Sequence, residues 1–270
     1  MRVSKLTDLE NITQHFRPDE ANFIEQVQGW VRQVADEYRP VLTHFLNPRQ
    51  RFIAQTIVNR EDGMRQASRG GLPNAEMQRM LIYPDYYVFV EADFHLQLME
   101  IVYPTKFADI HHNQILGTLV NQGIERNVFG DILGANETWQ FLIEDKMVDY
   151  FSLQVDRIGN IKVHLMPHAM ADIVQPEVDW VQTQTTIASL RIDVIISTAF
   201  NISRSRVKTL VEGGAVRLNW TEIIKPDYEL ATGDMLSVRG FGRMRLVELE
   251  GTTKKDKLRV VMETIQNNKK

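Results

Sequence analysis

The sequence predicts an α+β protein with a small helix-rich N-terminal domain, a central sandwich of helices on a sheet, and a C-terminal domain. Three changes along the chain support this prediction. In the first third, apolar residues recur at spacings of three and four, which is typical of amphipathic helices. From about residue 80 the apolar period shortens toward two, as in strands. After residue 187, two short helical patterns precede strands that a Gly-Asp turn separates.

The N-terminal domain, assigned to residues 1–75, is expected to hold two helices. Residues 19–38 carry apolar side chains on one helical face. A second helix is expected to begin at Pro48, because Asn47 is a good N-cap and proline is favoured in the first turn. Glycines and a proline within residues 61–75 predict turns and a domain boundary.

The central domain, assigned to residues 76–166, is expected to alternate strands and helices. Strands are predicted at 86–91, 96–103, 128–133, 138–143 and 161–166, and helices at 111–122 and 144–155. This order predicts an α+β sandwich with a ferredoxin-like or RNA-recognition-motif-like (RRM-like) topology. Residues 167–186 are predicted to link this domain to the C-terminal domain, residues 187–270.

Composition excludes several classes of function. The 270 residues include no cysteine, which excludes disulfides, thiolate nucleophiles and thiolate metal ligands. The N-terminus lacks the apolar run of a signal peptide and no stretch of about 18 apolar residues occurs, so we expect a cytoplasmic protein without a membrane span. The seven histidines lack metal-ligand spacing, and no phosphate-loop or dinucleotide motif is found, so no metal or cofactor is expected.

Charge is distributed unevenly along the chain. The formal net charge of −4 by itself argues against a nucleic-acid partner. However, residues 76–182 hold 6 basic and 16 acidic side chains, whereas residues 183–270 hold 15 basic and 10 acidic ones. The acidic middle therefore conceals a C-terminal segment with a net charge of +5, which suits contact with nucleic acid.

The most informative segment is a short predicted helix between Ser203 and Gly213. Ser203 is a good N-cap, and a Gly-Gly pair is a good C-terminal stop. The first turns carry Arg204, Arg206 and Lys208, although the helix dipole disfavours cations there. This arrangement favours a bound phosphate, held by the cations, the serine hydroxyls and the free N–H groups of the helix. A solvent-exposed basic face with an ordinary cap is the competing interpretation.

The elements around this helix follow the order helix, basic helix, strand, turn and strand. Across about 50 residues this segment resembles the S4 RNA-binding domain. The motifs that carry the resemblance are Leu190-Arg191-Ile192-Asp193, Ser203-Arg204-Ser205-Arg206, Gly214-Ala215-Val216, Asn219, Lys225-Pro226 and Gly233-Asp234. One position departs from the pattern, since Trp220 follows Asn219 where glycine is usual. Trp220 either loosens this turn, stacks on an RNA base or folds back on the domain.

The resemblance implies that the C-terminal domain grips phosphates of structured RNA. Asp193 is interpreted as a structural acid or as a partner of an arginine. The residues expected to contact RNA are Arg191, Ser203, Arg204, Ser205, Arg206, Lys208, Arg217, Asn219, Lys225, Arg239 and Arg243.

Further motifs extend a resemblance over nearly the whole chain, to the YlmH-type S4-domain proteins of bacteria. These motifs are Phe45-Leu46-Asn47-Pro48-Arg49-Gln50, Leu81-Ile82-Tyr83-Pro84, Ile115-Leu116-Gly117 and Gly130-Asp131-Ile132-Leu133. The resemblance implies three domains and a non-enzymatic, ribosome-associated RNA-binding protein. It also implies rescue of stalled large subunits that carry peptidyl-tRNA, and a link to cell division. The expected partners are rRNA or tRNA, or both, and the large ribosomal subunit.

The acidic central domain is expected to contact RNA only locally. Asn113 follows His112 where the family often has arginine, and the segment's charge opposes strong phosphate binding. Lys106, His112 and Arg126 are the candidates for such a local contact.

Two alternatives remain open. One is an RNA-modifying enzyme, such as a pseudouridine synthase, that uses Asp131 or another central acid. The arginine-leucine-aspartate signature of those enzymes is absent from the central region, so no catalytic residue is assigned. The other is an adaptor that binds a protein partner in cell division through its acidic central domain.

Overall fold

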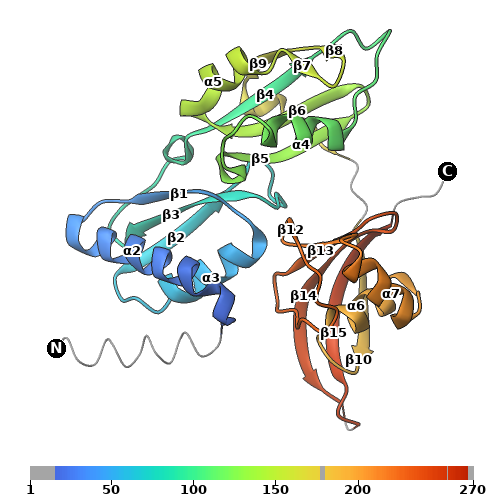
Figure 1. Cartoon of the computed structure of the whole chain (residues 1–270). Coiled ribbons are helices and arrows are strands. Elements are labelled where there is room, and N and C mark those ends of the chain that lie inside the picture. The colour runs from blue at the N-terminus through green and yellow to red at the C-terminus, as the bar shows by residue number, and fades with distance from the viewer. Residues whose placement is uncertain (1–15, 177–179, 254, 267–270) are drawn as a thin grey trace. The chain divides into compact units, whose positions relative to one another are not determined.

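The computed structural model describes residues 16–176, 180–253 and 255–266. The chain forms two compact units, residues 1–177 and 178–270, called the N-terminal unit and the C-terminal unit below (Figure 1). Both units mix helices with antiparallel sheets, which confirms the α+β class.

The first part of the N-terminal unit packs two helices on a three-stranded sheet. Its elements are α2 (Ala21–Glu37), β1 (Val41–Leu46), α3 (Pro48–Val58), β2 (Met64–Arg69) and β3 (Gln78–Pro84), and the sheet order is β1-β3-β2. Apolar residues of both helices and of β1 and β3 share one core. The two predicted helices are confirmed, and Asn47 caps α3 by accepting the N–H of Gln50 at 2.9 Å.

Two strands lie where the sequence predicted turns or a boundary. β2 occupies the segment assigned to turns, and β3 pairs with β1 and β2 although its residues were assigned to the central domain. Every residue of β3 is buried, so the strand shows no alternation of apolar and polar side chains. The predicted strand at 86–91 is wrong, because this segment forms a turn and an extended stretch that exposes Tyr86, Val88 and Val90.

The second part of the N-terminal unit has the predicted ferredoxin-like topology. Its main elements are β4 (Leu96–Val102), α4 (His112–Val120), β5 (Phe129–Ala135), β6 (Thr138–Glu144), α5 (Val148–Gln154) and β9 (His164–His168). The sheet order β5-β6-β4-β9 inserts β6, antiparallel, between β4 and β5, as in a split β-α-β unit. A small hairpin, β7 (Arg157–Ile158) and β8 (Ile161–Lys162), precedes β9.

Contacts between residues far apart in sequence join the two parts of this unit. The carboxylate of Asp131 on β5 accepts the backbone N–H groups of Glu76 and Met77 at 2.7 and 3.0 Å. A Cβ added to the neighbouring Gly130 would lie 2.7 Å from the ring of Phe45, so only glycine fits there. Motifs from separate segments therefore meet at this junction.

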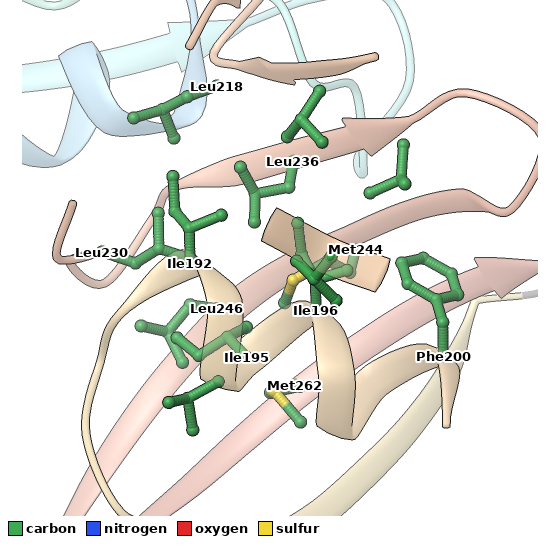
Figure 2. Close-up of a cluster of buried hydrophobic side chains, with 14 of the residues drawn as sticks. Ile192, Ile195, Ile196, Phe200, Leu218, Leu230, Leu236, Met244, Leu246 and Met262 are labelled. Carbon is green, nitrogen blue, oxygen red and sulfur yellow. The ribbon is translucent and has the colours of Figure 1, made fainter. Parts of the chain in front are cut away.

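The C-terminal unit places two helices on a six-stranded sheet. Its elements are β10 (Val181–Ile187), α6 (Ile192–Phe200), α7 (Arg204–Glu212), β11 (Val216–Leu218), β12 (Thr221–Glu222), β13 (Met235–Val238), β14 (Gly242–Thr252) and β15 (Leu258–Gln266). The sheet order is β10-β15-β14-β13-β11-β12. Figure 2 shows Ile192, Ile195 and Ile196 of α6 packed among side chains of the sheet such as Met244, Leu246 and Met262.

Strand β10 lies in the segment predicted as a linker. All seven of its residues pair with β15, so the last six residues of the predicted linker belong to the sheet. β10 is an edge strand with mostly exposed residues and a threonine- and glutamine-rich sequence. Its sequence therefore lacks the apolar alternation that identifies a strand.

Candidate nucleic-acid interface

The predicted basic helix is α7, and its N-terminus is exposed. Ser203 is the N-cap, and its Oγ accepts the N–H of Arg206 at 3.3 Å. Val207 and Val211 are buried in the core of the unit and fix the rotation of the helix. The residues at the start of α7 that face solvent are Ser203, Arg204, Ser205, Arg206 and Lys208. The sequence therefore predicted both the element and its exposed face.

Asp193, at the start of α6, forms ion pairs with two of the arginines that were predicted to contact RNA. Its carboxylate accepts Nε of Arg191 at 3.0 Å and Nη2 of Arg204 at 2.5 Å. Burial alone would raise the pKa of Asp193, but the hydrogen bonds of Arg204 and Arg191 outweigh it and lower that pKa. One ionised carboxylate thus orients two guanidinium groups, and the excess positive charge remains available to an anion.

The other two cations on α7, Arg206 and Lys208, make weaker contacts than Arg204 does. The guanidinium of Arg206 lies over the ring of Phe241, 5.2 Å from its centroid. Nζ of Lys208 lies 3.7 Å from the carboxylate of Glu212, at the surface, where such a pair contributes roughly 0 to 1 kcal/mol. Both side chains can turn toward a phosphate at little cost.

Arg217 and Arg243 lie on the opposite face of the sheet from α7. Val216 and Leu218 point into the core under the helices, so Arg217 between them points the other way. Arg217 pairs with Ser237 on β13, and Ser237 pairs with Arg243 on β14, which places the two arginines in one row. The structure therefore divides the predicted contacts into two faces.

Arg245 belongs to the same face of the sheet and was not among the predicted contacts. It lies two residues after Arg243 on β14, so both side chains share one face. Its guanidinium pairs with Glu263 and lies 4.7 Å from the ring centroid of Trp180. The two-residue spacing of arginines in a strand is the signal that identifies it.

Asn219 has a structural role rather than an open contact. Its Nδ2 donates to Asp234 at 2.8 Å, and its Oδ1 accepts the N–H of Met235 at 3.0 Å. These bonds use both ends of its amide. Asn219 and Trp220 form the two-residue turn between β11 and β12, with φ of +46° and +68°. For tryptophan, this left-handed conformation costs roughly 1 to 2 kcal/mol.

Lys225 and Arg239 are exposed at the surface of the C-terminal unit. Lys225 lies in the loop after β12, and Arg239 directly follows β13. In the central domain, Lys106 and His112 are exposed, whereas Arg126 donates to the carbonyls of Phe129 and Gly130 at 2.5 and 3.3 Å. Arg126 therefore supports the turn before β5.

Two other kinds of site were sought in the described part of the chain. No group of three or more histidine, aspartate or glutamate side chains there is placed to hold a metal ion. None of the helices in the described segments is long and apolar enough to cross a membrane.

Comparison with known proteins gives matches along the chain. Three family models match: "YlmH, N-terminal" over residues 19–87, "Putative RNA-binding domain in YlmH" over 90–172, and "S4 domain" over 190–236. The chain is 38% identical over 255 residues to ribosome-associated protein quality control protein P2 of Bacillus subtilis (strain 168), covering 94% of this chain and 99% of that protein.

A solved structure is also similar. The cell division protein ylmH from Streptococcus pneumoniae is 36% identical, with a TM-score of 0.52, over 60% of this chain and 98% of that chain. Family models, a relative and a solved structure therefore point to the same family. The chain belongs to the YlmH family of S4-domain proteins.

Proposed function

We propose that this protein is a non-enzymatic RNA-binding protein of the ribosome that grips structured rRNA or tRNA through its C-terminal unit. The observation that carries the proposal is the start of α7, where Asp193 orients Arg191 and Arg204 beside a serine-capped helix N-terminus. Cations, hydroxyls and backbone N–H groups converge there, and together they suit an RNA phosphate.

The names of the relatives support a more specific role. The Bacillus subtilis relative is named for ribosome-associated protein quality control, and the Streptococcus pneumoniae structure for cell division. We propose that this protein binds the large ribosomal subunit that carries peptidyl-tRNA, and that this role is linked to cell division. The predicted contacts Ser203, Ser205, Arg206 and Lys208 would bind the backbone beside the Asp193 pair.

Exchange of the α7 cations tests the RNA-binding proposal. Arg204→Glu with Arg206→Glu should weaken RNA and large-subunit binding at least tenfold, since attraction to two phosphates becomes repulsion. The dependence of log K on log salt should become shallower by about one for each phosphate that the protein no longer neutralises. Filter binding over a salt series and co-sedimentation with large subunits measure both effects.

Two further variants make this test specific. Arg206→Gln with Lys208→Gln leaves the Asp193 pair intact and should still weaken binding. Lys255→Glu with Lys257→Glu makes the same change of charge on the exposed β14–β15 hairpin and should change binding little. Unchanged co-sedimentation of both α7 variants would remove the support for this function.

The enzyme alternative would use Asp131 or another central acid, and the carboxylate of Asp131 accepts two backbone N–H groups. This position favours a structural role that joins the two parts of the N-terminal unit. Carbodiimide mapping of RNA from a deletion strain tests the enzyme alternative. Loss of a pseudouridine would favour the enzyme, and an unchanged pattern would count against it.

A further inference from the structure

The turn between β11 and β12 is held in place by its neighbours. Asn219 donates its N–H to the carbonyl of Met235 at 2.9 Å and bonds Asp234 and Met235 through its side chain. Asp234 is fully buried and also accepts the N–H of Ala231 at 2.8 Å. These contacts leave the turn little freedom to adopt another conformation.

The second position of this turn carries a residue that the turn itself does not favour. Two-residue hairpin turns with positive φ at both positions are most stable as Asn-Gly, because glycine has no Cβ to clash. Trp220 occupies the glycine position with φ of +68°. An indole at this place makes the fold less stable, so its presence calls for a reason outside turn stability.

Packing in the core of the C-terminal unit does not supply that reason. The partly buried apolar side chains packed against this core are Leu190, Ala199, Ile202, Leu210, Ile223, Tyr228, Phe241 and Leu258. Trp220, which is partly exposed, is not one of them. The described aromatic pairs likewise do not include it.

The surroundings of the turn suit a nucleic acid. Arg217 lies exposed on β11, three residues before the indole, and Lys225 lies exposed five residues after it. Glu222, the cross-strand partner of Arg217, has a carboxylate oxygen 2.9 Å from the position that a Cβ on Gly214 would take, and no ion pair between Glu222 and Arg217 is found among the described residues. An aromatic ring with cations close to it in the chain is a combination that binds single-stranded nucleic acid.

We propose that Trp220 is a stacking platform for an unpaired RNA base, and that Arg217 contacts the phosphate next to it. This inference rests on the proposed function. It adds the feature of the RNA that the protein recognises, which is a base that is not paired in a double helix. Such bases are available in loops, bulges and single-stranded ends.

The test uses the full-length protein and two fluorescein-labelled RNA stem-loops. One has an adenine-rich loop, and the other has the same backbone with abasic sugars in the loop. The wild-type protein should bind the adenine loop about 5- to 150-fold more tightly than the abasic loop, which is the effect of one stacked base. Trp220→Asn and Trp220→Gly should abolish this difference and leave affinity for the abasic loop unchanged.

Thermal unfolding separates stacking from a structural role. Asparagine and glycine tolerate positive φ, so both variants should melt at or above the temperature of the wild type. Trp220→Tyr should retain most of the preference for the adenine loop. A fall in melting temperature together with equal losses on both probes would overturn the inference and indicate a structural tryptophan.

The remaining outcomes are also decisive. If the variants keep the adenine preference, the stacking inference fails while the proposed function stands. Loss of large-subunit binding with unchanged binding of both probes would mean that Trp220 docks on protein, contrary to the inference. If the wild-type protein binds neither probe, the stacking inference fails, whereas the proposed function is still decided by co-sedimentation with large subunits.

Discussion

Asp131 in the N-terminal unit and Asp193 in the C-terminal unit each accept hydrogen bonds from two partners, yet their pKa values shift in opposite directions. Asp131 accepts neutral backbone N–H groups, and burial together with the charge of Glu76 raises its pKa to about 6. Asp193 accepts from two guanidinium groups, which outweigh burial and lower its pKa. The sign of each shift is therefore the balance of burial against nearby charge. Burial and Glu76 prevail at Asp131, whereas the two guanidinium groups prevail at the less buried Asp193.

The largest expected effect is a pH dependence of the N-terminal unit through Asp131. Its folded pKa of about 6 lies above 3.8, so the folded state binds more protons between these values. The stabilisation is complete below about pH 4 and is lost as pH rises through 6. Lowering the pH from 7 to about 4.5 should therefore stabilise this unit by about 2 kcal/mol.

Urea unfolding at several pH values measures this effect. Trp30 and Trp139 report on the N-terminal unit when Trp180 and Trp220 are replaced by phenylalanine. Asp131→Asn should remove the dependence over this pH range. A dependence that persists in Asp131→Asn would assign the titration to another group.

For Asp193 we expect a smaller pH dependence of opposite sign, in which the C-terminal unit loses stability as the pH falls. Because its folded pKa is lowered, its stabilisation is present above 3.8 and is lost as pH falls through the folded value. Asp193→Asn should destabilise the C-terminal unit by about 1.5 kcal/mol at pH 7, since charge-assisted hydrogen bonds become neutral ones. The difference between variant and wild type should shrink below pH 4.

Unfolding of a variant that keeps only Trp180 and Trp220 measures this second effect. Arg191→Gln and Arg204→Gln are the matched controls, because each removes one partner and keeps the acid. A constant difference from pH 7 down to pH 3 would show that the ion pairs do not stabilise the unit.

The smallest expected effect sharpens the cause of the Asp131 shift. Burial is the larger contribution to that shift and the charge of Glu76 the second. Glu76→Gln should therefore reduce, but not abolish, the gain in free energy of unfolding that acidification gives the N-terminal unit, by roughly 1 kcal/mol or less. Titration of the Asp131 carboxyl by NMR in both proteins gives the direct comparison. An unchanged pKa would leave burial as the only cause.

Local signals in the sequence predicted most of the helices. Asn47-Pro48 predicts the start of α3, and Ser203 with the following glycine pair predicts α7, because capping involves neighbours within a few residues. The ferredoxin-like order was predictable because four of its strands and both helices show clear periods. Strands β3 and β10 were missed, since one is buried on both faces and the other is an exposed edge.

The sequence by itself determined the family motifs and the capped basic helix, because each depends on residue types at short spacing. Only the tertiary structure decided that Arg217 and Arg243 lie across the sheet from Arg204, since strand register sets which face a side chain takes. It also decided the role of Asp131, whose partners lie 54 and 55 residues away. The physical reason is that burial and pairing across strands depend on contacts between distant segments, which no local pattern records.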